Sequence, residues 1–197
     1  MRPIIKILAT CLSLAFLAGC GVTQPARFYI LTPVESGGET TAPGPALGVG
    51  PVDFPAYLDR PEIAHRSGNN QLHFADSDRW AEPLKTTFTR TLAENLAVML
   101  PSDRISLYPW ARTTRVDYQI SIDVVRFDAD ASGTIVLVAG WEIIRPDDST
   151  VVSRQRRSYT EAAGGVVYPA IVAAQSRAVE RLARDIVTAI TAQPATR

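Results

Sequence analysis

The 197-residue sequence contains only two cysteines, Cys11 and Cys20, and both lie within the first twenty residues. A disulfide-stabilised scaffold and a four-cysteine zinc site are therefore excluded, because each needs more cysteines than the chain holds. A net charge is also missing, since 20 basic residues stand against 20 acidic ones. A broad cationic surface of the kind that binds nucleic acid is therefore not expected, and we expect no nucleic-acid partner.

Signals for catalysis and metal binding are equally scarce. The two histidines, His65 and His73, are too few for a zinc site, which uses three or four protein ligands. Residues 128–133 (DADASG) match the first half of a calcium-binding EF-hand loop, but Ala139 occupies the position of the essential glutamate, so a hairpin turn is expected there. No serine lies in a Gly-x-Ser-x-Gly elbow. These absences predict a protein that is not an enzyme and holds no metal or cofactor.

The N-terminus has the features of a bacterial secretory signal. Arg2 and Lys6 flank the start of an apolar run over residues 4–18. A short basic region followed by 7–15 apolar residues is typical of such signals, and the run is shorter than the roughly 20 residues of a transmembrane helix. It ends in residues 17–20 (LAGC), which resemble a lipobox, the site at which bacterial lipoproteins are acylated and cleaved.

Cys20 is the predicted lipid-attachment residue. The rival string LATC ends at Cys11, but Thr10 is unfavourable there and too few apolar residues precede it. Cleavage before Cys20 removes Arg2 and Lys6 and leaves 178 residues with 18 basic and 20 acidic side chains. An uncleaved signal anchor and an ordinary export signal are the alternatives.

Acylation at Cys20 would fix the protein to a membrane. Three acyl chains, each contributing about 0.8 kcal/mol per buried CH₂, make the attachment effectively permanent. Aspartate directly after the cysteine is the usual signal for retention at the inner membrane, and residue 21 is glycine. We therefore expect the protein to lie at the periplasmic face of the outer membrane, with the acyl chains on Cys20 inserted into the lipid.

The hydrophobic patterning after residue 27 predicts a single α+β domain with a mainly antiparallel sheet and two long helices packed on one face. Apolar alternation and turn residues predict strands at 28–31, 47–52, 62–67, 71–75, 104–108, 116–124, 134–144 and 151–161. The strand at 134–144 is apolar on both faces and is expected at the centre, whereas 151–161 carries three arginines and is expected at an edge. Close approach of another backbone is expected at Gly48 and Gly50.

Two segments have helical periodicity. The first covers 77–100, with Asp76 or Ser77 as its N-terminal cap and Pro101 as its stop. Its apolar residues recur every four positions, and Trp80 is the first of them. The second covers 168–192.

Residues 50–63 are the most unusual stretch of the chain. They hold three prolines together with the large apolar residues Phe54, Tyr57 and Leu58, and follow neither helical nor strand periodicity. Proline stiffens such a segment and lowers the entropy lost when it docks onto a partner or a lipid surface. The alternative is a loop whose three apolar side chains cover the sheet edge.

Four motifs in order carry a family resemblance: 28–31 (FYIL), 51–61 (PVDFPAYLDRP), 66–70 (RSGNN) and 74–84 (FADSDRWAEPL). Together with the lipobox they resemble the PqiC family of ABC-type transport auxiliary lipoproteins of Gram-negative bacteria. The resemblance continues more loosely through Tyr118, Trp141 and the last helix. It implies a non-enzymatic subunit of an intermembrane lipid transport system that contains MCE-domain tunnel proteins.

The resemblance also implies partners and a division of the chain. We expect a signal peptide at 1–19, a lipidated tether at 20–27, the auxiliary lipoprotein domain at 28–193 and a disordered tail at 194–197. The domain is expected to dock an MCE-domain tunnel protein at the outer membrane and to support membrane integrity, with repeated copies forming a ring-shaped homo-oligomer around the tunnel's end. A structural envelope lipoprotein without a transport role is the alternative function. The candidate contacts with partner or lipid are Phe54, Tyr57, Leu58, Arg60, Asn69, Asn70 and Trp80.

Overall fold

The computed structural model describes residues 24–35, 44–68, 70–100 and 102–193. The expected signal peptide at 1–19, Cys20 and the expected tail at 194–197 lie outside these residues. The described helices are α2 and α3, and a short 3₁₀ helix, η1, follows the second strand. The elements are β1 (Arg27–Tyr29), β2 (Leu47–Asp53), η1 (Ala56–Leu58), β3 (Glu62–Arg66), β4 (Leu72–Trp80), α2 (Leu84–Met99), β5 (Ile105–Leu107), β6 (Tyr118–Ala129), β7 (Thr134–Arg145), β8 (Thr150–Ala162) and α3 (Tyr168–Thr191).

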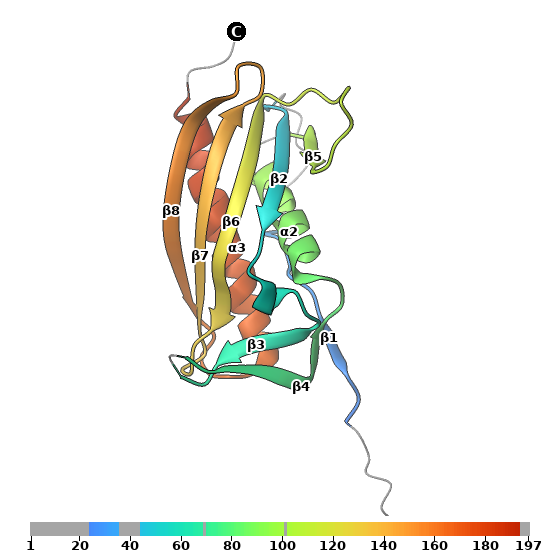
Figure 1. The fold of residues 1–197 in the computed structure, drawn as a ribbon, viewed down its shortest axis with the longest axis vertical. Coiled ribbons are helices and arrows are strands. Elements are labelled where there is room, and N and C mark those ends of the chain that lie inside the picture. The colour runs from blue at the N-terminus through green and yellow to red at the C-terminus, as the bar shows by residue number, and fades with distance from the viewer. Residues whose placement is uncertain (1–23, 36–43, 69, 101, 194–197) are drawn as a thin grey trace, which may run out of the picture.

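The strands form one eight-stranded sheet, and both helices lie on the same face of it (Figure 1). The long ladders, β6 with β7 and β7 with β8, are antiparallel. β2 runs parallel to β6, and β5 runs parallel to β2. The β3–β4 hairpin crosses the lower end of the sheet in Figure 1, and β1 pairs with the end of β4. The predicted α+β fold with two helices on one face is confirmed.

The hydrophobic core lies between the helices and the sheet. Alternate residues of β7 face the helices and are fully buried, whereas their neighbours on the opposite face are half-buried. Because β7 is paired on both sides, it is an interior strand, but it lies next to the edge and not at the centre that its continuous apolar character predicted. β8 forms that edge, as expected. The helix residues that close the core follow a helical spacing and include Phe88, Leu92 and Leu96 of α2 and Ile171, Ala178, Leu182 and Ile186 of α3.

The predicted start of the first helix is wrong. Residues 76–80, expected to cap and begin it, belong to β4, and α2 begins only at Leu84 with Pro83 as its N-cap. The Pro83 carbonyl accepts the first hydrogen bonds of the helix, from the amides of Thr86 and Thr87. The helix ends at Met99, and Leu100 has the extended backbone that a residue before proline favours.

The turn predicted at 128–133 is two residues shorter in the structure than expected. β6 continues to Ala129 after a bulge near residue 125, and the Asp128 side chain is fully buried. The turn comprises residues 130–133, where Asp130 Oδ1 accepts hydrogen bonds from the backbone amides of Ser132 and Thr134 and from the Ser132 hydroxyl. A local Asx-type turn, not a calcium loop, therefore joins β6 to β7.

The two strand glycines in β2 make room for side chains, and the expected backbone approach is not seen. A Cβ at Gly48 would lie 2.5 Å from Cη2 of Trp110. A Cβ at Gly50 would lie 2.6 Å from the Cβ of Tyr108, and Gly50 has a φ of 120° that other residues rarely adopt. The absence of a side chain at these two glycines thus makes room for the aromatic residues of the segment that connects β5 to β6.

Candidate functional site

Two of the apolar candidates between β2 and β3 serve the fold. The Phe54 ring packs edge-on against Phe88 of α2, with ring centroids 5.1 Å apart. Leu58, in η1, is 5% exposed and belongs to the core. These two side chains therefore pack onto α2 and the hydrophobic core and contribute to stability.

Tyr57 takes part in a buried polar cluster that the sequence pattern did not reveal. Its hydroxyl donates a 2.8 Å hydrogen bond to Oδ2 of Asp128. Burial and the neighbouring Asp128 carboxylate raise the pKa of Tyr57 to about 12. Arg66 and Arg126 also donate to Asp128 through their Nε atoms, at 3.0 and 2.7 Å from Oδ1. These partners explain how a carboxylate is accommodated at a fully buried position.

Arg60 and Trp80 meet in a pocket, although twenty positions separate them in the chain. The pocket has a volume of about 320 Å³ and is lined by Asp59, Arg60, Pro61, Trp80, Ala81, Glu82 and Pro83; we call it the Arg60–Trp80 pocket. The Trp80 amide donates a 2.7 Å hydrogen bond to the carbonyl of Pro61, which joins the two walls. Trp80 itself is only 4% exposed, so it forms the floor more than the rim.

The Arg60 side chain is held in place although it is exposed. Its guanidinium carbon lies 3.7 Å from the ring centroid of Phe74, a cation–π contact. Its Nε donates a 3.0 Å hydrogen bond to Glu62, and this hydrogen bond lowers the pKa of the Glu62 carboxyl. A positioned cation beside a proline-lined apolar surface is suited to reversible recognition of a partner with apolar and acidic groups.

The opposite wall of the Arg60–Trp80 pocket is fixed by α2. Arg90 donates two hydrogen bonds to the Glu82 carboxylate, one of them 3.0 Å from Nη1 to Oε2. Pro83 is the N-cap of α2 and is exposed at the pocket rim. The sequence motif at 74–84 contained both Glu82 and Pro83, but neither was predicted as a site residue.

The pocket is connected directly to the N-terminal strand. The amide of Ala81 donates a 2.8 Å hydrogen bond to the carbonyl of Tyr29 in β1. Asp78, on β4, accepts hydrogen bonds from the Tyr29 hydroxyl at 2.6 Å and from Arg27 at 2.7 and 2.8 Å. Burial raises the pKa of Asp78, but the hydrogen bonds from Arg27 and Tyr29 outweigh it and lower the pKa overall.

The remaining candidates do not join this pocket. Asn70 is exposed in the turn of the β3–β4 hairpin, at the opposite end of β4 from Trp80. Asn69 and Cys20 lie outside the described residues. His65 and His73 face each other across the hairpin, with ring centroids 4.8 Å apart. Among the residues that the structure describes, no three acidic, histidine or cysteine side chains are grouped as metal ligands.

Comparison with known families decides the membership of the chain. The family model for the ABC-type transport auxiliary lipoprotein component matches residues 29–187. The chain belongs to this family. The match includes the Arg60–Trp80 pocket, all of α2 and most of α3, and the family is one of transport auxiliary lipoproteins, not of enzymes.

Solved structures share the fold of this auxiliary lipoprotein. An uncharacterized protein has a TM-score of 0.71 at 18% identity, covering 85% of this chain and 99% of its own. Protein XCC0632 from Xanthomonas campestris, of family DUF330, has a TM-score of 0.65 at 20% identity, covering 84% of this chain and 96% of its own. A search of curated protein sequences finds no match. Within the described part of this auxiliary lipoprotein, neither helix is apolar enough over a sufficient length to cross a bilayer.

Proposed function

We propose that this auxiliary lipoprotein is an outer-membrane subunit of an MCE-type intermembrane lipid transport system. Residues 1–19 act as its signal peptide, and acylated Cys20 anchors it at the periplasmic face. The domain then docks an MCE-domain tunnel protein, so that lipid passes between tunnel and membrane without covalent chemistry. The family membership supports a transport accessory, and the Arg60–Trp80 pocket supplies a docking site for the partner.

The hydrogen bond between the pocket and the N-terminal strand β1 is the observation that carries this proposal. Ala81 of the pocket is hydrogen-bonded to Tyr29, and Tyr29 lies only nine residues after Cys20 in the sequence. Nine residues of extended chain span at most about 32 Å. The lipid anchor therefore keeps the pocket close to the membrane surface, where the end of a tunnel would have to be held.

A pocket-filling variant tests the docking site. Ala81 is exposed and lines the pocket, so Ala81→Tyr occupies the space that a partner would use. Ala111→Tyr is the matched control, because Ala111 is also exposed and lies at the other end of the molecule, between β5 and β6. Blocking a central contact should weaken binding by about 2 kcal/mol or more, roughly 30-fold in Kd.

The measurement is co-purification of the MCE-domain protein with the full-length lipoprotein after crosslinking in cells. We expect Ala81→Tyr to lose the partner and Ala111→Tyr to keep it; equal recovery from both variants would remove the pocket from the proposal. Fractionation of Cys20→Ser tests the anchor, which is refuted if this variant remains in the outer membrane. Unchanged lipid transfer in cells without the protein would instead favour a structural envelope lipoprotein.

Ring formation belongs to the same proposal. Repeated copies around the end of a tunnel would place several anchors and several pockets side by side, which raises the effective concentration of each contact. Native mass spectrometry of the acylated protein in detergent should give one closed oligomer. A monomer at all concentrations would refute the ring.

A further inference from the structure

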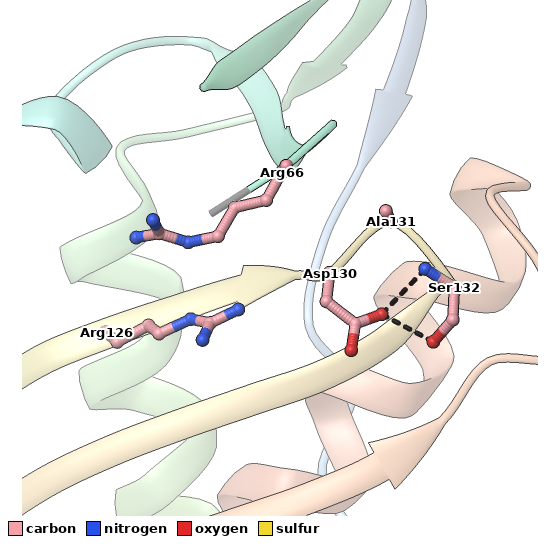
Figure 2. Close-up of a pocket in the computed structure, with 6 residues that line it drawn as sticks. Arg66, Arg126, Asp130, Ala131 and Ser132 are labelled. Atoms are coloured by element: carbon pink, nitrogen blue, oxygen red, sulfur yellow. Dashed lines mark hydrogen bonds between the residues drawn. The ribbon is translucent and has the colours of Figure 1, made fainter. Parts of the chain in front are cut away.

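A second pocket lies between the turn of the β3–β4 hairpin and the turn that joins β6 to β7 (Figure 2). Its volume is about 430 Å³, within the range of sites that hold small ligands. The lining residues are Arg66, Gly68, Arg126, Asp130, Ala131 and Ser132; we call it the Arg66–Asp130 pocket. None of these residues takes part in the docking site proposed above.

One wall of the pocket carries positive charge. Arg66 and Arg126 both donate through Nε to the buried Asp128 carboxylate, so two guanidinium groups share one carboxylate. The three side chains together hold one positive charge in excess. Arg126 Nη2 is buried and has no hydrogen-bond partner among the described residues. A small movement of this partly exposed side chain would let Nη2 donate to an oxygen atom in the pocket.

The other wall carries negative charge. Asp130 uses Oδ1 for the three hydrogen bonds of its turn, from the amides of Ser132 and Thr134 and from the Ser132 hydroxyl. The hydrogen bond from Ser132 contributes most to lowering the pKa of Asp130, and the carboxylate is therefore ionised at neutral pH. Figure 2 shows the other carboxylate oxygen of Asp130, Oδ2, outside the dashed hydrogen bonds of the turn.

The charges of the pocket sum to zero but are separated in space. Arg66 and Arg126 balance Asp128 and Asp130. A ligand with only negative charge gains from the arginines and is repelled by Asp130, whereas a ligand with both signs can satisfy the two walls at once. Guanidinium groups bind phosphate oxygens through paired hydrogen bonds, and a carboxylate binds an ammonium group.

The pocket lies at the end of the molecule from which the N-terminal strand leads towards Cys20. In Figure 1 the β3–β4 hairpin crosses this lower end, with β1 at the Trp80 end of β4 and the hairpin turn at the other. The nine residues of β4, at about 3.3 Å each, separate these two points by roughly 30 Å. A membrane held against this end by acylated Cys20 would bring lipid headgroups near the pocket.

We propose that the Arg66–Asp130 pocket binds a zwitterionic phosphate ester, with its phosphate beside Arg66 and Arg126 and its ammonium group beside Asp130. The ethanolamine headgroup of a membrane phospholipid has this chemistry. Membrane lipid as the source rests on the proposed anchor at Cys20, but binding of the headgroup by the pocket does not. The two inferences can therefore fail separately.

The test uses the full-length acylated protein in a non-ionic detergent, titrated by calorimetry with three soluble probes. Glycerophosphoethanolamine has both charges, glycerophosphoglycerol has only the negative charge, and inorganic phosphate represents a ligand that does not come from lipid. Ala131 is exposed on the turn, so Ala131→Glu places a larger, negatively charged side chain in the pocket. This side chain takes up the space of the ligand and repels its phosphate without touching the Asp128 cluster. Ala111→Glu makes the same change at an exposed position of the segment that connects β5 to β6, and this segment lies at the upper end of the molecule in Figure 1.

We expect glycerophosphoethanolamine to bind most tightly, and Ala131→Glu to weaken it at least tenfold while Ala111→Glu binds as the wild type does. Asp130→Asn keeps the acceptor oxygen of the turn but removes the charge, so it should lose the preference over glycerophosphoglycerol. No binding of glycerophosphoethanolamine, or equal binding by the two glutamate variants, would overturn the proposal. Tighter binding of inorganic phosphate than of either ester would assign the pocket to a soluble anion and would also overturn it.

Discussion

Replacing Phe54 by alanine tests whether its ring contributes to the stability of the fold. Phe54 is half-buried, and its ring meets Phe88 at 5.1 Å with an interplanar angle of 82°. Truncating a fully buried phenylalanine costs about 3–5 kcal/mol, so a half-buried ring should cost about 2 kcal/mol. That loss corresponds to roughly a 30-fold shift in the unfolding equilibrium.

The assay is urea denaturation of the wild type and Phe54→Ala, followed by tryptophan fluorescence, since Trp80 and Trp141 are buried and report on the core. Phe28→Ala is the matched control, because Phe28 is 64% exposed and its loss should cost less than about 1 kcal/mol. A double-mutant cycle with Phe88→Leu should give a coupling of about 0.5–1.5 kcal/mol. If Phe54→Ala is no less stable than Phe28→Ala, the packing argument is refuted.

Three further predictions concern other parts of the fold. Gly48→Ala should lower the free energy of unfolding by about 1–3 kcal/mol in a denaturation experiment, because its Cβ would lie 2.5 Å from the Trp110 ring. This loss should be smaller when Gly48→Ala is made together with Trp110→Ala. An unchanged loss in that background would contradict the prediction. Asp128→Asn should lower the free energy of unfolding by about 3 kcal/mol, because two guanidinium groups lose a fully buried counter-charge. A melting temperature equal to that of the wild type would contradict a stabilising role of this charge cluster. Burial and then the neighbouring imidazole lower the pKa of His65, so the unfolded chain binds the proton more readily, and stability should fall as the pH drops below about 6.5. His65→Gln should flatten this part of a curve of melting temperature against pH, and an identical slope in the variant would assign the effect to other groups.

The sequence predicted correctly those elements in which the pattern of apolar residues follows directly from which faces of the element are buried. β7 is apolar on both faces because strands pair with it on both sides and α3 covers one face, and this pattern is visible in the chain alone. The predicted start of α2 was wrong because Trp80 and Leu84 are spaced by one helical turn. The same spacing arises when a strand ends at a buried Trp80 and a helix begins at a buried Leu84. What decides the local structure there is pairing with β1, some fifty positions earlier in the chain.

The candidate site was predictable only in part for a related reason. Arg60 and Trp80 were each predicted as contact residues, but the hydrogen bond that brings their segments together could not be read from spacing. Asp128 was assigned to a turn because Asp-Ala-Asp-Ala-Ser-Gly reads as one locally. Its burial depends on the bulge in β6 and on Arg66, 62 positions away, so the charge cluster exists only in the folded chain.

The pairing of β1 with β4 determines how a mechanical load reaches the domain. A pull on the N-terminal tether acts on β1 first, along the direction of the strand. Because β1 and β4 run parallel in register from Arg27 to Tyr29, such a pull loads their hydrogen bonds in shear, all together, and does not open them one after another. Arg27 and Tyr29 add their side-chain bonds to Asp78 against the same displacement. A pulling force on the residues before β1, such as movement of the proposed partner would produce, would therefore be resisted at β1 itself.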